Sequence, residues 1–273
     1  MDTNLTIITA PHSKTGKRVV NLFNKAGLAY RGASRTSEVP FDWTQPETWI
    51  DTLHSANAIY IVLPPDLAFS GLPEILKRFL KFCSAKRLKK IVLLSGRGEE
   101  EALKCEQLTL SCGIPATVVR ASWFSQNFSE GMFQEEIQKG EIVVPVKEVK
   151  EPFVDAEDIA EVVFRALTET GHANKVYELT GPELLSFEDV AHRFSQQLGK
   201  PVKASYVPID EYLAMLHQAN IPIEEIEVIK FLYMELLDGR NERLAFGVEE
   251  ALGRKSASIT QFIDRHKTTD LWL

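Results

Sequence analysis

The residues near the start of the chain that could do chemistry are grouped in one turn. This turn follows the apolar stretch Leu5–Ala10 and offers an imidazole, two hydroxyl groups and an ammonium group, from His12, Ser13, Thr15 and Lys14. A lysine charge, small hydroxyls and the start of a helix attract anions such as phosphate. Gly16 is the glycine expected where the helix packs closely on the strand. The pattern predicts a turn that borders the phosphates of a nucleotide.

This turn departs from the usual turn of a dinucleotide-binding βαβ unit, which carries three glycines. Ala10 and Ser13 occupy two of the three positions. Each adds a Cβ, which either keeps the pyrophosphate farther from the backbone or strains the backbone of the turn. Pro11 fixes φ and removes one backbone donor. We expect a nicotinamide nucleotide to bind with weakened affinity or shifted geometry. The alternative is a site that has lost this cofactor or takes another ligand.

The end of the second predicted strand bears on the choice of cofactor. Domains that prefer NAD usually carry Asp or Glu there, whereas this chain has Ser34, Arg35 and Thr36. A guanidinium group can pair with a 2′-phosphate, and two hydroxyls can add hydrogen bonds. This favours NADP(H) over NAD(H). The alternative is an exposed arginine on a loop.

Two further strand ends are expected beside the nucleotide. One apolar strand ends at Leu63 and Pro64, and another ends at Ser95 and Gly96. The carboxyl ends of parallel strands meet at one edge of a sheet, where ligands bind. Gly96 would allow close approach of the cofactor.

A later strand end carries two aromatic residues, Trp123 and Phe124. They could wall a pocket for a small-molecule substrate near the nicotinamide. The alternative is packing between two lobes of the protein.

The elements that position these residues alternate between strands and helices. The expected strands are Leu5–Ala10, Ala29–Ser34, Val39–Phe41, Ala58–Leu63, Lys90–Ser95 and Ala116–Arg120. The expected helices are Lys14–Ala26, Pro46–Leu53, Gly71–Ala85 and Glu99–Ser111. Nearly continuous apolar strands separated by helices predict an α/β fold with a doubly wound parallel sheet.

The second half of the chain predicts a smaller mixed α/β lobe. Its expected strands are Val143–Val146, Phe153–Val154, Val176–Leu179 and Val202–Val207, and its expected helices are Ala156–Thr170, Ser186–Leu198 and Ile259–His266. Ser186 is the expected cap of the second of these helices. We therefore expect a nucleotide-binding domain over residues 1–150 and a substrate-binding or lid lobe over 151–273, with the ligand between them.

Composition limits the class of protein. The 273 residues carry a net charge of -7, which leaves no basic surplus for a nucleic-acid partner. No stretch resembles a membrane span, and the polar start does not resemble a signal peptide. Cys83, Cys105 and Cys112 lack metal-ligand spacing and suit free thiols in a reducing cytosol. We expect a cytoplasmic monomer or homodimer without a metal.

A family resemblance runs through most of the chain. The segments that carry it are Thr9–Gly16, Phe41–Trp43, Ser111–Asn127, Phe153–Ala160, Tyr177–Pro182 and Gly247–Arg254. Their order and spacing resemble the NmrA-like group of atypical short-chain dehydrogenases/reductases, nearest to the ergot-alkaloid dehydrogenase type. The resemblance implies a Rossmann-type domain that binds NAD(P), and it adds Asn127 to the expected substrate pocket, although an Asn at a turn is also common.

Catalytic residues cannot be assigned from the sequence. No tyrosine has a lysine four residues later, so the usual proton-transfer dyad of short-chain dehydrogenases is absent. Ala102 stands where some relatives carry a lysine, and Lys104 lies on another side of the predicted helix. The resemblance implies a reductase of a small carbonyl, quinone or imine-type substrate. The alternative is a non-catalytic regulatory protein that senses NAD(P).

Overall fold

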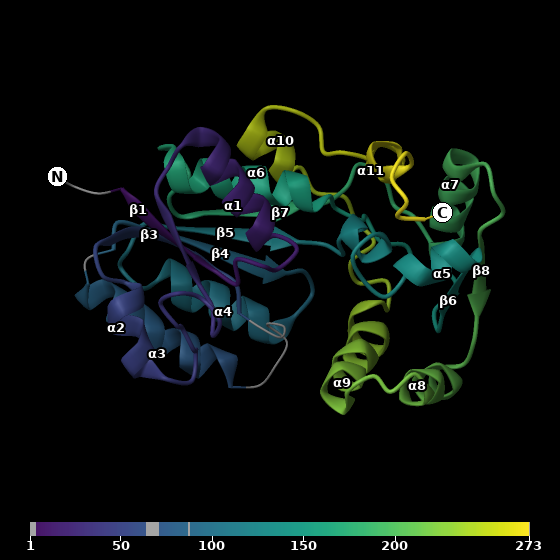
Figure 1. Ribbon diagram of the computed structural model, residues 1–273, viewed down its shortest axis with the longest axis horizontal. Helices are drawn as coiled ribbons and strands as arrows, with labels where there is room; N and C mark the ends of the chain where they lie inside the picture. Colours follow the sequence, from purple (N-terminus) through teal and green to yellow (C-terminus); the bar gives the residue numbers. More distant parts are fainter. Residues whose placement is uncertain (1–3, 64–70, 87, 273) are drawn as a thin grey trace. The chain divides into compact units, whose positions relative to one another are not determined.

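Six strands form one parallel sheet in the computed structural model, which describes residues 4–63, 71–86 and 88–272. The strand order is β2-β1-β3-β4-β5-β7 (Figure 1). The strands are β1 (Leu5–Thr9), β2 (Tyr30–Ala33), β3 (Ala56–Ile61), β4 (Lys90–Gly96), β5 (Ala116–Ala121) and β7 (Lys175–Leu179). All neighbours pair in parallel, which confirms the predicted doubly wound α/β architecture.

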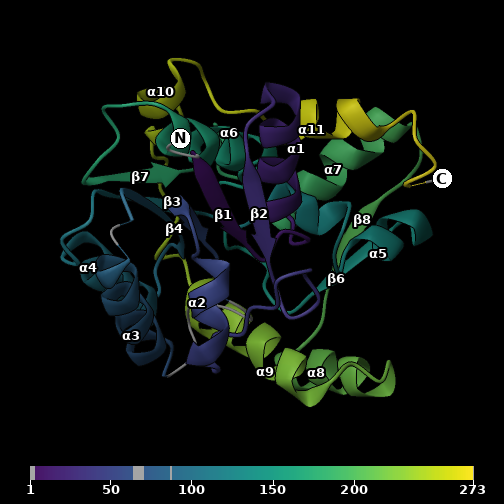
Figure 2. The ribbon, with the colours of Figure 1, turned by 60° about the vertical axis from the view of Figure 1, so that its left-hand side comes forward.

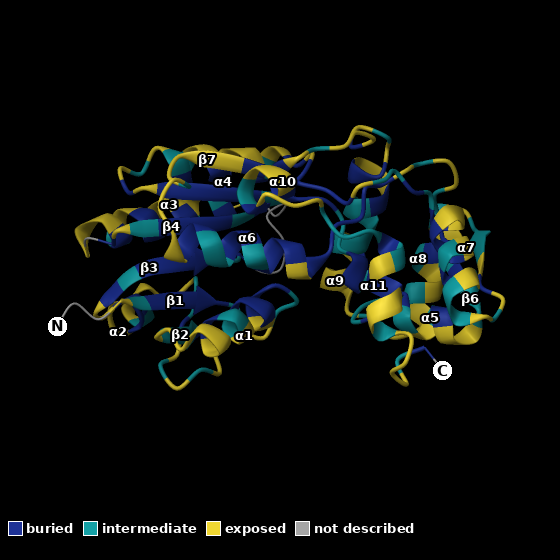
Figure 3. Ribbon diagram, turned by 90° about the horizontal axis from the view of Figure 1, so that it is seen from above, coloured by how far each residue is buried: buried dark blue, intermediate teal, exposed yellow. Residues whose placement is uncertain are grey.

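Helices cover both faces of this sheet (Figure 2). One face carries α1 (Gly16–Ala26), α6 (Ala156–Thr168) and α10 (Gly247–Leu252), and the other carries α2 (Trp49–Thr52), α3 (Leu72–Ala85) and α4 (Glu100–Leu110). The central strands are accordingly buried, as Figure 3 shows for β1 and β3. Apolar side chains on both faces of each strand are what such a covered sheet requires.

Contacts divide the chain into two units that interleave along the sequence. Unit 1 consists of Met1–Ala121, Ala156–Leu179 and Phe246–Lys255, and unit 2 consists of Ser122–Asp155, Thr180–Ala245 and Ser256–Leu273. The functional domains expected over residues 1–150 and 151–273 stay a prediction.

The structure corrects three local expectations in whole or in part. Val39–Phe41 forms no strand; Phe41 is instead buried against the rings of Trp43 and Phe79, so its apolar character serves side-chain packing. The helix expected over Pro46–Leu53 is a 3-10 turn over Pro46–Thr48 followed by the short α2.

The third correction concerns the strand expected over Val176–Leu179 in the second lobe. This strand is β7, and it completes the large sheet by pairing with β5, with Val118 opposite Val176. The pairing joins segments more than fifty residues apart, which no local pattern reveals.

Unit 2 is built around a small sheet and an aromatic core. Its strands β6 (Glu141–Val144) and β8 (Lys203–Tyr206) pair in parallel. Its helices are α5 (Gln134–Lys139), α7 (Phe187–Leu198), α8 (Ile209–Gln218), α9 (Ile223–Phe231) and α11 (Ile259–His266), with 3-10 and π-helical turns at Ser125–Phe128 and Leu232–Leu236. The predicted cap is confirmed, since Ser186 forms a capping box with Asp189. Within the described ranges, no helix is long and apolar enough to span a membrane.

Candidate functional site

The turn after β1 holds an alanine in a backbone conformation that favours glycine. Ala10 has a φ of 48°, in the left-handed region where a Cβ is unfavourable. The Ser13 amide donates to the Ala10 carbonyl oxygen over 3.0 Å and closes the turn. Pro11 packs over Gly32 of β2, where an added Cβ would lie 3.1 Å from the Pro11 ring.

Gly16 is required by the packing of this turn. A Cβ at Gly16 would overlap the carbonyl oxygen of Ala10 and lie 2.9 Å from Ser13 Oγ. The Gly16 amide donates to Ser13 Oγ over 3.0 Å, so a protein hydroxyl takes one of the amides at the start of α1. This hydroxyl is the clearest departure from a turn that leaves such amides to a phosphate.

Two backbone donors of the turn remain available to an anion. The amides of His12 and Thr15 donate to no atom in the part of the chain that the structure describes. The His12 side chain is exposed, and that of Lys14 is half-buried. With the α1 dipole, these groups fit a pyrophosphate.

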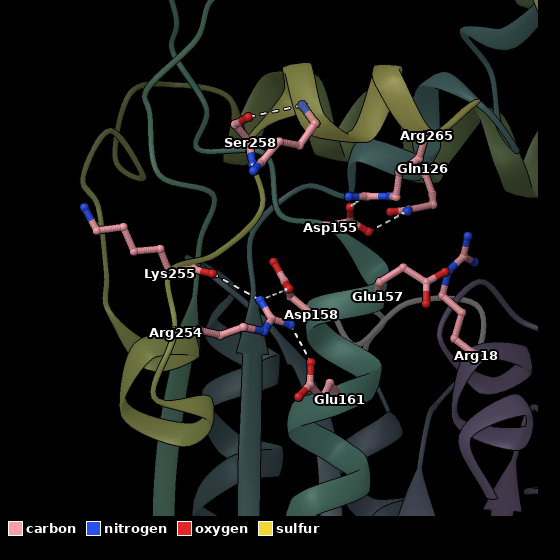
Figure 4. Close-up of polar contacts among 11 residues, drawn as sticks. Arg18, Gln126, Asp155, Glu157, Asp158, Glu161, Arg254, Lys255, Ser258 and Arg265 are labelled. Atoms are coloured by element: carbon pink, nitrogen blue, oxygen red, sulfur yellow. Dashed lines mark hydrogen bonds and ion pairs between the residues drawn. The ribbon is translucent and has the colours of Figure 1, made fainter. Parts of the chain in front are cut away.

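The buried side chain of Arg18 stabilises the turn through a hydrogen bond and an ion pair. Arg18 is 6% exposed, donates from Nη1 to the Lys14 carbonyl oxygen over 2.7 Å, and pairs through Nε with Glu157 Oε1 at 2.8 Å (Figure 4). Glu157 lies in the first turn of α6, so this ion pair ties the turn to a second helix of unit 1.

Thr15 faces the protein interior. Its Oγ1 accepts a hydrogen bond from the buried Tyr60 hydroxyl at 3.0 Å. Burial raises the pKa of Tyr60, so this hydroxyl stays a donor. Thr9 Oγ1 accepts from the Val62 amide at 2.8 Å and donates to the Tyr60 carbonyl, which joins the ends of β1 and β3. Contact of the Thr15 side chain with a cofactor stays a prediction.

The segment after β2 carries the Arg35 guanidinium group and several hydroxyl side chains. Arg35 is exposed, and the Ser34 hydroxyl lies 2.8 Å from that of Ser37 and 3.3 Å from that of Thr36. The pKa of Asp42 is lowered, chiefly by hydrogen bonds from Thr44 and to a lesser degree by the charge of Arg35. A guanidinium beside several hydroxyls suits a phosphate monoester.

The ends of β4, β5 and β7 carry a buried charged network that the sequence analysis missed. Ser95 Oγ donates to Glu106 Oε1 over 2.6 Å, and Glu106 pairs with Arg120. Arg120 also reaches Glu178 at 3.4 Å, and Glu178 accepts from Arg97 Nε at 2.8 Å. The signal was present as charged residues next to apolar strands, but their pairing depends on the sheet order.

Gly96, at the end of this β4 strand, lies against a carboxylate. A Cβ at Gly96 would overlap Glu99 Oε1 and lie 3.0 Å from Oε2, and Glu99 is only 6% exposed. The glycine therefore makes room for Glu99.

Further ion pairs involve acidic residues of α6 and Asp155, which precedes this helix in the sequence (Figure 4). In unit 1, Arg254 Nη1 lies 2.7 Å from Asp158 Oδ1 and Nη2 lies 2.5 Å from Glu161 Oε2. In unit 2, Asp155 accepts from Gln126 Nε2 at 2.9 Å and pairs with Arg265. The acidic residues Asp155, Asp158 and Glu161 thus serve the structure of each unit.

The remaining candidates stand as follows. Leu63 is buried in the core of unit 1, and Pro64 lies outside the described residues. In unit 2, Trp123 packs against Phe187 and Tyr233, with ring centroids 6.3 and 5.8 Å apart.

Two neighbours of Trp123 complete the expected substrate pocket. Phe124 accepts through its carbonyl from the Asn127 amide at 3.0 Å. Trp123, Phe124 and Asn127 are each partly exposed, and their role in a substrate pocket stays a prediction.

Comparison with known proteins places these features in a family context. The model described as NmrA-like family matches residues 100–271. Agroclavine dehydrogenase from Claviceps fusiformis is 30% identical over 98% of this chain and 98% of its own length.

Two solved structures share the fold. A nucleoside-diphosphate-sugar epimerase from Staphylococcus aureus superposes with a TM-score of 0.82 at 13% identity, covering 95% of this chain and 99% of its own. An NADPH-dependent quinone oxidoreductase from Escherichia coli, complexed with NADPH, gives a TM-score of 0.80 at 16% identity, with the same coverage of 95% and 99%. At these identities the likeness shows the fold alone.

Proposed function

We propose that this chain, which belongs to the NmrA-like family, is a reductase that uses NADP(H) to reduce a small carbonyl, quinone or imine-type substrate. The observation that carries the proposal is Arg35, exposed at the end of β2 beside the hydroxyls of Ser34 and Ser37. An acidic residue in this place would favour the ribose hydroxyls of NAD instead. The full-length similarity to a dehydrogenase and the NADPH complex of a fold neighbour support the proposal.

The residues of the turn after β1 would suit the pyrophosphate of NADP(H), and Arg35 would suit its 2′-phosphate. The amides of His12 and Thr15 and the start of α1 would hold the pyrophosphate, with Lys14 nearby as a point charge. Arg35 would hold the 2′-phosphate. The cofactor supplies a hydride when bound. Ala10, Ser13 and Gly16 set the shape of this cradle through backbone and packing.

The proton needed for carbonyl reduction has no assigned donor on this chain. Ala102, which is fully buried in α4, has only a methyl side chain and can donate no proton. Reduction of an imine-type cation needs no acid for the hydride step, and a positioned water can serve a carbonyl or quinone. We therefore keep all three substrate classes.

Titration of the purified chain with NADPH, NADP+, NADH and NAD+ by calorimetry tests the proposal. We expect Arg35→Ala to weaken NADPH binding by about tenfold or more, since one charge-assisted pair contributes about 1.5–3 kcal/mol. NADH affinity should change little. Failure of all four nucleotides to bind would overturn the proposal.

A second function, a non-catalytic sensor of NAD(P), is favoured by two observations. The Ser13 hydroxyl accepts the hydrogen bond of the Gly16 amide, which is then not available to a phosphate. The buried Ala102 stands where some relatives carry a lysine. Turnover of NADPH with a panel of quinones, aldehydes and iminium compounds separates the two functions. Cofactor binding without turnover of any compound would favour the sensor.

A further inference from the structure

Two buried serine hydroxyls in unit 2 make no hydrogen bond within the part of the chain that the structure describes. Ser125 begins the 3-10 turn Ser125–Phe128 and is 1% exposed, and Ser129 follows the turn and is 3% exposed. A buried hydroxyl without a partner costs free energy, so each such group calls for a bound water or a ligand as its partner.

The Ser125 side chain shares a face of the chain with Trp123, which is expected to wall the substrate pocket. Phe124, between them, has an extended backbone with φ of -83° and ψ of 133°, and it forms a parallel bridge with Val154. Side chains two residues apart on an extended segment point to the same face. The Val154 amide donates to the Trp123 carbonyl oxygen, and the Ser125 amide donates to the Val154 carbonyl oxygen, each over 2.8 Å. These bonds hold the backbone that sets this arrangement.

The Trp123 side chain is held by ring contacts. It packs against Phe187 and Tyr233, which are 2% and 3% exposed, while Trp123 itself is partly exposed. The buried Trp272 donates its indole N–H to a backbone carbonyl oxygen, whereas the N–H of Trp123 has no acceptor among the described residues. Because no hydrogen bond to the described chain opposes it, a small movement of Trp123 can open the Ser125 hydroxyl to a substrate.

A hydroxyl donor beside an aromatic wall favours some of the three substrate classes kept above. When the carbon of a carbonyl or quinone group accepts a hydride, negative charge develops on its oxygen, and a positioned hydroxyl stabilises that charge. Burial strengthens this effect because little water screens the charge. An imine-type cation becomes neutral in the same step and leaves no anion for a hydroxyl to stabilise.

We propose that the Ser125 hydroxyl donates a hydrogen bond to the oxygen of a carbonyl or quinone substrate that lies against Trp123, and that this protein therefore reduces such substrates in preference to imine-type cations. The inference rests on the proposed reductase function and goes beyond it by selecting the substrate class. Ser129 is not part of this contact, because it follows the turn at its other end.

The test compares Ser125→Ala with Ser129→Ala and with the unaltered full chain. Both changes remove a buried hydroxyl that has no partner among the described residues, so Ser129→Ala is the matched control. The melting temperature and the calorimetric affinity for NADPH are measured for each protein. Rates give kcat/KM for NADPH-dependent reduction of menadione, benzaldehyde and an N-methyl-dihydroisoquinolinium salt, which is an imine-type cation.

We expect neither variant to melt below the unaltered protein, and a rise of up to about 4 °C fits the loss of an unpaired buried hydroxyl. Affinity for NADPH should stay the same. Ser125→Ala should lower kcat/KM for the quinone and the aldehyde by about a hundredfold, the effect of removing one donor to a developing anion. Any turnover of the iminium salt should stay unchanged, and Ser129→Ala should keep all rates.

Three results would overturn the inference while leaving the cofactor site standing. One is unchanged reduction of menadione and benzaldehyde by Ser125→Ala. Another is a lower melting temperature of this variant with equal losses for all substrates, which would mean that a buried water pairs with the hydroxyl in a structural role. The third is reduction of the iminium salt alone by the unaltered chain. If the unaltered chain reduces none of the compounds, the proposed reductase function fails, and this inference fails with it.

Discussion

The turn after β1 and the ends of β4, β5 and β7 lie on the same edge of one sheet, yet they bury polar groups in different ways. Within the turn, neutral hydroxyls and backbone groups pair over short distances, as in the contact of Tyr60 with Thr15, although Arg18 also joins the turn to Glu157 through an ion pair. At the other strand ends, ionised groups pair, as in the contact of Glu106 with Arg120. The first arrangement depends on shape and the second on matched charge.

This difference explains which departures from a family pattern are tolerated. Ala10 and Ser13 stand where the family resemblance implies glycines, and the turn is closed by a hydrogen bond between them with Ala10 in a strained conformation. A charged network has no such latitude, because removing one partner leaves a buried charge unmatched. Variation in ligand binding is therefore easier at the turn than at the ends of β4, β5 and β7.

The largest expected effect on stability comes from removing one charge from the network at the ends of β4, β5 and β7. Glu106→Gln keeps the shape of a 3% exposed side chain and removes its charge. Of its two carboxylate partners among the described residues, Arg120 then keeps only Glu178, at the longer distance of 3.4 Å. We expect a loss of about 3 kcal/mol in the free energy of unfolding, measured by urea denaturation.

Two further variants test whether the loss of stability comes from the broken ion pair or from any substitution on this helix. Glu100→Gln, exposed on the same helix, should change stability by less than about 0.5 kcal/mol. The double variant Glu106→Gln/Arg120→Gln should cost less than the sum of the single changes, because the two residues interact directly. Additive costs would contradict the network.

The next effect concerns the shape-dependent turn. Gly16→Ala forces a methyl group into the Ala10 carbonyl oxygen, a backbone atom that cannot move aside alone. We expect about 1–3 kcal/mol of destabilisation and a loss of nucleotide binding. Asn21→Ala, exposed on the same helix, is the control and should leave both unchanged. If Gly16→Ala keeps the thermal stability and the calorimetrically measured nucleotide affinity of the unaltered protein, the packing argument is refuted.

The two regions also differ in how far the sequence predicted them. Strand–turn–helix order, the place of Gly16 and the cap at Ser186 follow from local spacing, and the structure has the predicted architecture. The sequence could not show that Thr15 faces Tyr60, because 45 residues separate them.

The charged network was missed for the same reason on a larger scale. Arg97 and Glu178 are 81 residues apart and meet only because β7 pairs with β5. The strand itself was expected in the second lobe. Long-range pairing, which no period in the sequence encodes, decides both the sheet order and the partners of its buried charges.

A smaller effect tests the neutral pairing at the turn. Tyr60→Phe removes the buried hydroxyl that donates to Thr15 and leaves the ring in place. We expect a loss of about 1 kcal/mol in thermal or urea denaturation, far below that of Glu106→Gln. Tyr30→Phe is the matched control, because within the described residues its hydroxyl makes no hydrogen bond. Equal costs for both variants would show that the Tyr60 contact contributes nothing specific.

The smallest expected effect has the opposite sign. Ala10→Gly relieves a left-handed φ of 48°, and this gain of about 1–2 kcal/mol is partly offset by the greater freedom of glycine in the unfolded chain. We expect a net stabilisation of about 0.5 kcal/mol, visible as a small rise in Tm, and tighter nucleotide binding because the Cβ no longer limits approach. Ser55→Gly, at a φ of 62° outside the turn, is the control. It should stabilise the fold to a similar degree without changing nucleotide affinity. A different outcome is that both variants change stability alike and Ala10→Gly leaves nucleotide affinity unchanged. The alanine would then affect only the backbone conformation. Weakened binding of the pyrophosphate would instead have to come from Ser13, whose hydroxyl accepts a hydrogen bond from the Gly16 amide.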